Sequence, residues 1–281
     1  MPTFDTPEPI SVRLGLGFVA ADVRVVAGDR TDTTIDVRPA DPSSKTDAKL
    51  AEQVRIEYAD GELVVRTPKL GGLFSRIRSV EVTVGLPSGS QLQGEIGMGE
   101  LHCEGRLGDC RIKTGFGPIR LDRAGAVHLK SGSGDVTVGH ADGGAEITAS
   151  NGAVSVRRID GPARVKNSNG ASWVGEVTGD LHLSGANGAI TVDRARAGVT
   201  AKNANGSVRI GEVVRGAVTL ETAAGSVEVG IRTGTAAWLD LHTVAGRVRN
   251  ELAEGAEPDP TEEAVEVRAR TQVGDVVVRR T

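Results

Sequence analysis

The chain has 281 residues, a net charge of −4 at pH 7, 38 glycines, and only four Phe, two Trp and one Tyr. The near-balanced charge excludes the basic surface typical of nucleic-acid binding, and no run approaches the roughly 18 apolar residues of a membrane-spanning helix. We therefore expect no nucleic-acid partner and no membrane insertion. Because aromatic residues are so few, the core must be packed from small aliphatic side chains.

The N-terminal segment MPTFDTPEPISVRLG lacks the basic and apolar regions of a secretory signal peptide. This predicts a cytoplasmic protein. The two cysteines, Cys103 and Cys110, are close in sequence. In a reducing compartment, they are expected to be free thiols rather than a disulfide.

Residues 1–90 are expected to form an N-terminal cap rich in β-strands, because apolar and polar residues alternate strongly there. The segment ADGELVV predicts a hairpin with its turn at Asp60 and Gly61. The segment DPSSKTDAKLAEQ is expected to hold a loop and one short helix with Asp47 as its N-cap. Such a cap would cover the first open strand edge of the region that follows.

Residues 91–250 are dominated by a sequence repeat with a nearly constant period. Segments such as SNGAVSV, ANGAITV and AAGSVEV each contain one marker glycine. The markers are evenly spaced except that the last interval is longer by one: Gly134, Gly152, Gly170, Gly188, Gly206 and Gly225. Degenerate copies extend the array to about ten coils of roughly 18 residues each, and a fixed period of this kind is typical of a solenoid.

Within each repeat, apolar and polar residues alternate on both sides of the turn, which is typical of strands rather than helices. One column is expected to face inward: Ala145, Ala163, Leu181 and Val199. The adjacent column is expected to face outward: Glu146, Arg164, His182 and Thr200. The pattern predicts an all-β fold, a single-chain parallel β-solenoid (β-helix) with two short strands in each coil.

In four successive coils, the turn after the first strand contains an Asn-Gly pair. The asparagines are Asn151, Asn169, Asn187 and Asn205, and the glycines are Gly152, Gly170, Gly188 and Gly206. Asn-Gly suits a turn in which both residues have positive φ. Stacked at one corner, the amides are expected to form a structural hydrogen-bonded ladder, with a ligand-binding row of amides as the alternative.

The end of the repeat region is less regular. The segment 251–263 is predicted to be an acidic loop, because it holds six carboxylates, two prolines and no base. Residues 264–281, with the strands EAVEVRAR and VGDVVV, are expected to be the closing strands of the solenoid. Trp238 falls where the repeat lengthens and is expected to fill the irregular end of the core.

Three features resemble a bacterial family of β-strand-repeat domains of unknown function that is labelled "putative adhesin". They are the lead-in strand SVEVTVGLPSGSQLQGEIGMGELHCEG, the tandem S/A-N-G-x-V-x-V units and the closing VGDVVV. The N-terminal segments PTFDTPEPISV and DVRVVAGDRTDT resemble those of actinobacterial-type members. The resemblance implies a β-solenoid scaffold and, through some relatives, a link to cell-envelope stress.

The sequence shows no convincing catalytic, cofactor-binding or metal-binding constellation. His128 and His182 share an expected outward column, but three coils would separate them by about 14 Å, too far for one zinc ion. The outward columns carry mixed charges rather than paired acids, and the glycine-rich turns open strands rather than the helix of a phosphate loop. We therefore expect no cofactor, no metal and no enzymatic activity.

Trp173 is the surface residue that most suggests binding. Alternation with Ser172 and Val174 directs it outward, and its column also contains Thr191 and Arg209. An exposed Trp near an Arg is typical of a binding hot spot, so these three residues are candidate partner contacts. A loop or the N-terminal region covering Trp173 is the alternative.

Two classes of function follow from these patterns. The favoured one is a non-enzymatic β-solenoid that presents a rigid surface to a protein partner or assembles with itself. The alternative is a β-helix enzyme acting on a polysaccharide, which would need a groove with two carboxylates about 5–9.5 Å apart. The sequence does not identify the partner.

Overall fold

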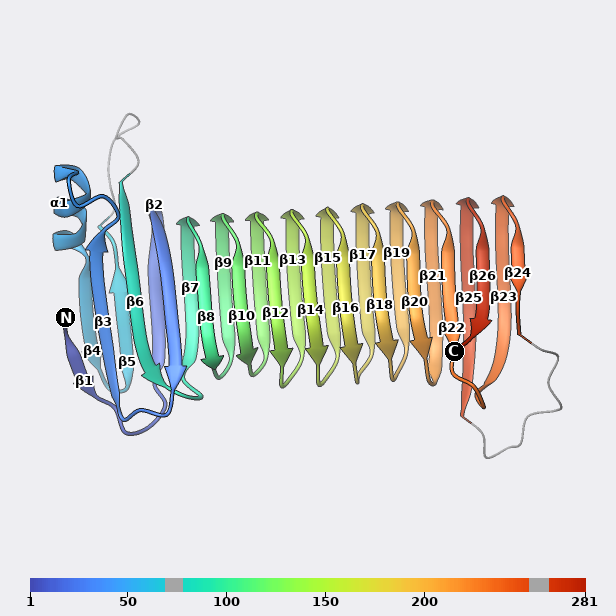
Figure 1. Cartoon of the computed structure of the whole chain (residues 1–281), viewed down its shortest axis with the longest axis horizontal. Coiled ribbons are helices and arrows are strands. Elements are labelled where there is room, and N and C mark those ends of the chain that lie inside the picture. The colour runs from blue at the N-terminus through green and yellow to red at the C-terminus, as the bar shows by residue number, and fades with distance from the viewer. Residues whose placement is uncertain (69–77, 253–262) are drawn as a thin grey trace. The chain divides into compact units, whose positions relative to one another are not determined.

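The computed structural model describes residues 1–68, 78–252 and 263–281 (Figure 1). Most of the predicted acidic loop, 251–263, therefore lies outside the described residues. The chain divides into two compact units, residues 1–142 and 143–281.

In its described residues, the first unit begins with six strands and one helix. These elements are β1 (Thr3–Asp5), β2 (Ser11–Gly28), β3 (Asp32–Pro39), α1 (Lys45–Gln53), β4 (Arg55–Ala59), β5 (Glu62–Arg66) and β6 (Ser79–Pro87). Antiparallel pairs join β1 to β3, β3 to β6 and β4 to β5. The β4–β5 turn has positive φ at Asp60 and Gly61, which confirms the predicted hairpin.

Strand β2 links this N-terminal region to the coils. Its first half pairs in parallel with β5 and with β7 (Gln91–Met98), and its second half pairs in parallel with β6 and with β8 (Leu101–Arg106). One long strand thus lies on both strands of the first coil. It covers the backbone edge that the coil would otherwise expose.

The helix begins one turn earlier than the sequence predicts. Its N-cap is Ser44, whose hydroxyl accepts a hydrogen bond from the Asp47 N–H at 3.3 Å. Asp47 is buried instead, and its carboxylate accepts a hydrogen bond from the Ser79 N–H at 3.2 Å. The prediction of Asp47 as N-cap is wrong because this carboxylate binds the start of β6, which the local pattern does not reveal.

The remaining strands of the first unit form regular coils. They are β9 (Cys110–Phe116), β10 (Ile119–Ala124), β11 (Val127–Ser133) and β12 (Val136–Ala141). Strands β7, β9 and β11 stack in one parallel ladder, and β8, β10 and β12 stack in another. The inward side chains of both ladders, such as Ile112 and Leu121, are buried.

The second unit repeats the same coil with greater regularity. Its strands are β13 (Ala145–Asn151), β14 (Val154–Ile159), β15 (Ala163–Asn169), β16 (Ser172–Val177), β17 (Leu181–Asn187), β18 (Ile190–Ala195), β19 (Val199–Asn205), β20 (Val208–Val213), β21 (Gly216–Ala224), β22 (Val227–Ile231), β23 (Ala236–Ala245), β24 (Val248–Asn250), β25 (Ala264–Val273) and β26 (Val276–Arg280). Successive coils pair in parallel with the predicted register, for example Ala163 with Leu181 and Leu181 with Val199. This confirms the parallel β-solenoid.

The order of the last coils in space differs from their order in the chain. Strand β25 pairs with β21 on one side and with β23 on the other, and β26 likewise pairs with β22 and β24. Residues 264–281 therefore fill a gap one coil inside the end, and the end coil is β23–β24. The expectation that 264–281 close the solenoid is wrong, because chain order does not specify which coil a returning strand joins.

The marker glycines are required by the stacking of the turns. Gly188 has φ +131°, and a Cβ there would lie 2.3 Å from the carbonyl oxygen of Gly170 in the adjacent coil. The asparagines before these glycines end strands, and Asp60 is the only described non-glycine residue with positive φ. The expectation of positive φ at Asn151, Asn169, Asn187 and Asn205 is therefore wrong, since only the glycine turns the chain.

Buried asparagines inside the coils tie the turns together in pairs. The Asn167 amide donates to the carbonyls of Gly152 and Gly170, both at 3.0 Å. The Asn203 amide donates to the carbonyls of Gly188 and Gly206 at 2.8 and 3.1 Å. Each asparagine thus serves its own coil and the preceding one.

The coils on either side of Asn167 have a small residue at the same position. Ala149 is paired with Asn167, and Gly185 is paired with Asn167 on the other side. A Cβ at Gly185 would lie 2.7 Å from Asn203 Oδ1. The inner column therefore alternates small residues with asparagine over two coils.

This alternation predicts how coil deletions behave. Deleting one coil, Leu181–Gly198, should leave a folded chain because the inward columns are preserved, whereas deleting only its second half, 190–198, should not. Deleting two coils, Ala163–Gly198, should lower the melting temperature less than deleting one, because the single deletion places Asn167 against Asn203. Thermal unfolding by circular dichroism measures all three. Equal melting temperatures for the half-coil and one-coil deletions would contradict the 18-residue register of the coils.

Replacing Gly188 with Ala should lower the free energy of unfolding by at least about 3 kcal/mol, because positive φ and a backbone clash both oppose a Cβ. Gly234 is the matched control: its φ is +82°, but a Cβ there would meet nothing within 4 Å. Gly234→Ala should cost only about 1 kcal/mol. Urea unfolding measures the free energy of unfolding of both variants. Equal losses would show that the clash of a Cβ with the adjacent turn is unimportant.

Candidate functional site

The candidate site lies on the outer face of the second unit, on strands β16, β18, β20 and β22. Trp173 is half-buried in β16 between the buried residues Ser172 and Val174. Its partners across the ladder are Ser155 on one side and Thr191 on the other. The alternation of the strand therefore directs the indole outward, while its neighbours fill the core.

Two contacts fix the orientation of the Trp173 ring. The indole N–H donates to both carboxylate oxygens of Asp193 in β18, at 3.1 and 3.2 Å. The ring also lies over Gly175, where an added Cβ would come within 3.2 Å of Cη2 of the ring. Gly175 thus provides room for the ring, and Asp193 holds its polar edge.

The three predicted contact residues are brought together on successive coils. Trp173 pairs with Thr191, and Thr191 pairs with Arg209 in β20. Arg209 lies 3.7 Å from Glu228, which also pairs with Arg279 at 2.8 Å. The result is a half-buried aromatic ring beside a short polar and charged column.

A ladder of alternating charge borders this face, and the sequence reasoning missed it. In register on successive coils, the side chains are Arg158, Glu176, Arg194 and Glu212. Arg158 and Glu176 are 2.9 Å apart, as are Arg194 and Glu212. The signal that could have revealed the ladder is the change of charge sign at this position from each repeat to the next.

A polar cleft of about 490 Å³ opens at this border. Its lining is Arg194, Arg196, Glu212, Val214, Arg215, Arg232 and Glu263. Glu212 is paired with Arg194, and Glu263 lies 3.9 Å from Arg215. Each carboxylate of the cleft therefore has a guanidinium beside it.

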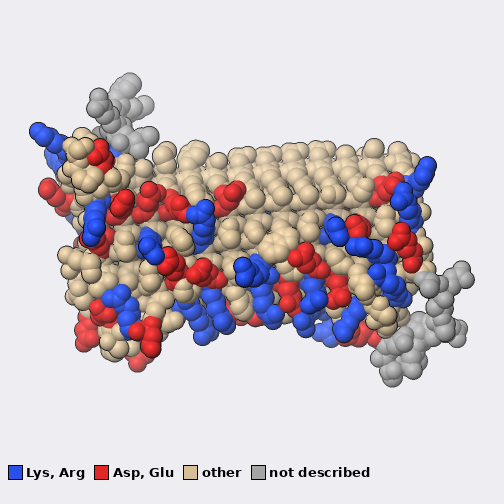
Figure 2. All heavy atoms as spheres, in the orientation of Figure 1, with Lys and Arg blue, Asp and Glu red and all other residues tan. Residues whose placement is uncertain are grey.

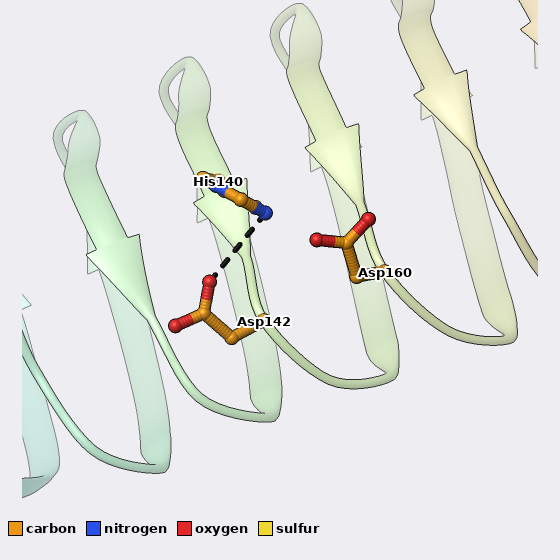
Figure 3. A group of neighbouring side chains, drawn as sticks. All are labelled: His140, Asp142 and Asp160. Atoms are coloured by element: carbon orange, nitrogen blue, oxygen red, sulfur yellow. Dashed lines mark ion pairs between the residues drawn. The ribbon is translucent and has the colours of Figure 1, made fainter.

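Figure 3 shows His140 and Asp142 of the first unit, joined by an ion pair at 3.4 Å. Burial alone would raise the pKa of Asp142, but the hydrogen bond and charge of Arg123, with His140 and Arg106, hold that pKa below its ordinary value. Asp160, also drawn there, belongs to the second unit, where it accepts a hydrogen bond from Arg158 at 2.9 Å. Both carboxylates thus take part in salt bridges with arginine.

The two cysteines are buried free thiols of the first unit. Burial raises the pKa of Cys103 well above its ordinary value and raises the pKa of Cys110 to about 12. The reactive thiolate form is therefore disfavoured at neutral pH, in contrast to a catalytic cysteine.

The amides of the Asn-Gly turns hydrogen-bond along the stack. Asn169 donates to Asn151 at 3.0 Å, Asn187 to Asn169 at 2.8 Å, and Asn205 to Asn187 at 3.0 Å. Along most of this edge of the second unit, Figure 2 shows no charged side chains. Each of these amides is used within the ladder, so the turns are bound to one another.

The described residues contain no helix of the length and apolar composition needed to cross a membrane. A family model described as Toastrack DUF4097 matches residues 13–279. The comparison with curated proteins finds no significant match.

Several solved structures are similar over almost the whole chain. A "putative adhesin" from Parabacteroides merdae is 11% identical, with 100% of this chain and 95% of that chain covered and a TM-score of 0.41. A "putative lipid binding protein" from Parabacteroides distasonis is 11% identical, with 98% and 95% covered and a TM-score of 0.43. A "putative cell adhesion protein" from Clostridium sporogenes is 14% identical, with 100% and 98% covered and a TM-score of 0.22.

Replacing Trp173 with Ala should change the free energy of unfolding by about 1 kcal/mol or less, because the ring lies outside the core. Val174→Ala is the matched control on the same strand, and removal of this buried side chain should cost about 2 kcal/mol or more. Urea unfolding measures both. A loss of about 3–5 kcal/mol for Trp173→Ala would identify the ring as core.

Proposed function

The chain belongs to the family described as Toastrack DUF4097, and we propose that it is a non-enzymatic β-solenoid scaffold that binds a protein partner. The proposed binding face consists of Trp173, Thr191 and Arg209. The observation that carries the proposal is the outward indole of Trp173, held by Asp193 and lying over Gly175.

A ring held in this way is suited to binding. Association loses free energy when mobile side chains become ordered, and an indole already fixed by two contacts loses less. Trp and Arg also dominate the energetically important positions of protein interfaces. The parallel ladders below the ring keep Trp173, Thr191 and Arg209 at constant spacing.

The chemistry of this face indicates what the partner presents. The indole needs an apolar surface or a shallow pocket, while Arg209 can bind a carboxylate or a backbone carbonyl. Glu228 lies beside Arg209. It therefore favours a partner that carries a positive charge close to the group that Arg209 binds. We therefore propose a folded protein surface with a central apolar patch and charges of both signs at its rim.

The cellular setting is part of the same proposal. We propose a link to cell-envelope stress, which the family resemblance supports, and a cytoplasmic location. Localising the tagged full chain, with and without envelope-damaging treatment, tests both. A signal confined to the cell exterior would contradict the proposed location.

Affinity capture with the full chain tests the binding face. The wild-type chain should retain a partner from a lysate of the source organism that Trp173→Ala loses. Arg164→Ala is the control, because it also removes an exposed side chain but lies on β15, in the other ladder of the unit. With the purified partner, calorimetry should show that Trp173→Ala weakens binding by about 2 kcal/mol. A partner retained equally by both variants would contradict this face.

A further inference from the structure

The end coil of the second unit, β23 and β24, has strand partners on one side only. In the described part of the chain, β23 pairs with β25 and β24 pairs with β26. The Ala236 N–H donates to the Glu263 carbonyl beside β25. Because backbone groups of a parallel strand alternate between its two sides, those of Ala237, Leu239, Leu241 and Thr243 point away from β25.

Apolar side chains are exposed on the same coil. Trp238 is 57% exposed, Val244 is 74% exposed and Val248 is 46% exposed. Leu239 and Leu241, which continue the inward columns of Val267 and Ala269, are only half-buried, although those two inner residues are fully buried. The expectation that Trp238 fills the core is therefore wrong, because its strand alternation turns it outward.

An open strand edge with exposed apolar side chains is prone to pair with another strand. The opposite situation occurs at the N-terminal end of the first unit, where β2 covers the first coil and antiparallel strands and α1 follow. Among the described residues, no comparable element pairs with β23 on its open side. The β23 strand thus provides both unpaired hydrogen-bonding groups and apolar surface.

We propose that β23 pairs with β23 of a second copy of this chain, antiparallel about a two-fold axis through Leu241. In this register Leu241 meets its own counterpart, and Leu239 meets Thr243. On the outer side, Asp240 meets His242 and Trp238 meets Val244. Each outward acid is thus opposite an imidazole that can donate a hydrogen bond, and each exposed apolar side chain is opposite another.

Neighbouring registers lack this complementarity. Moving the axis to Asp240 places the two Asp240 carboxylates opposite each other, with only Arg270 of each chain, among the described residues, to offset their repulsion. Moving it to His242 places Asp240 opposite the apolar Val244. An axis between two residues would pair inward side chains with outward ones, because the side-chain period of a strand is two.

The backbone agrees with the Leu241-centred register. The residues whose N–H and C=O groups point away from β25 are odd-numbered, and this register pairs odd-numbered residues with one another. They would form the hydrogen-bonded pairs of an antiparallel ladder, while Asp240–His242 and Trp238–Val244 would form the intervening closer pairs. The self-pairing is independent of the binding face at Trp173, which lies on β16.

Sedimentation velocity of the full chain at about 1–100 µM should show the monomer of 29.1 kDa converting to a dimer as concentration rises. Val244→Asp should weaken the dimer by about tenfold or more, because it replaces an apolar contact with a carboxylate opposite the electron-rich Trp238 ring. Val244 is well exposed, so the variant should melt like the wild type. Trp173→Ala should leave the dimer unchanged, which separates this proposal from the binding face.

Disulfide trapping tests the register. Leu241→Cys should oxidise to a covalent dimer, because paired Cα atoms across an antiparallel ladder lie about 5.5 Å apart. Leu239→Cys is the matched control: it lies on the same strand and face, but its counterpart would be about 13 Å away. A wild-type chain that stays monomeric, a dimer unaffected by Val244→Asp, or equal trapping at both cysteines would overturn the proposal.

Discussion

The close approach of successive marker turns is the constraint on which the rest of the structure depends. At these turns the glycine Cα faces the carbonyl oxygen of the glycine in the adjacent coil, so that a Cβ would lie about 2 Å from that oxygen, as at Gly170, Gly188 and Gly206. Only glycine fits this position. Because one such glycine recurs in every coil, the glycines keep each coil in the same register and place the aliphatic columns above one another.

Along the stack, the residue types near the turns alternate from coil to coil, so their pattern repeats every two coils. Inside, Asn167 and Asn203 each bind two turns, and Ala149 and Gly185 leave the space they need. On the outer face, Gly175 and Gly211 occupy the position that Asp193 occupies on the coil between them. As glycines they have no side chain there and leave room. The orientation of Trp173 follows from this outer alternation, because its ring lies over Gly175 and its N–H reaches Asp193. The candidate binding residue is thus fixed by the packing that fixes the fold.

The two ends of the chain treat their strand edges differently. In the first unit, β2 pairs with both strands of the first coil. In the second unit, β25 and β26 return into the stack and leave β23 and β24 at its end. A solenoid cannot satisfy the backbone groups of its outermost coil by itself, so each end needs a covering element or a partner. The exposure of Trp238 and Val244 is a consequence of this arrangement.

The sequence by itself determined the features that depend on local geometry and a constant period: the parallel coil, its inward and outward columns, the glycine at each turn, the Asp60–Gly61 hairpin and the outward direction of Trp173. It did not determine Ser44 as the helix cap, because the burial of Asp47 against Ser79 is a long-range contact. Nor did it determine the Asp193 hydrogen bond to Trp173, the charge ladder of Arg158 and Glu176, or the place of the last coils. Tertiary structure decided these features. The hydrogen bond and the charge ladder join residues on different coils. The place of the last coils depends on which of several similar coils the returning strand joins.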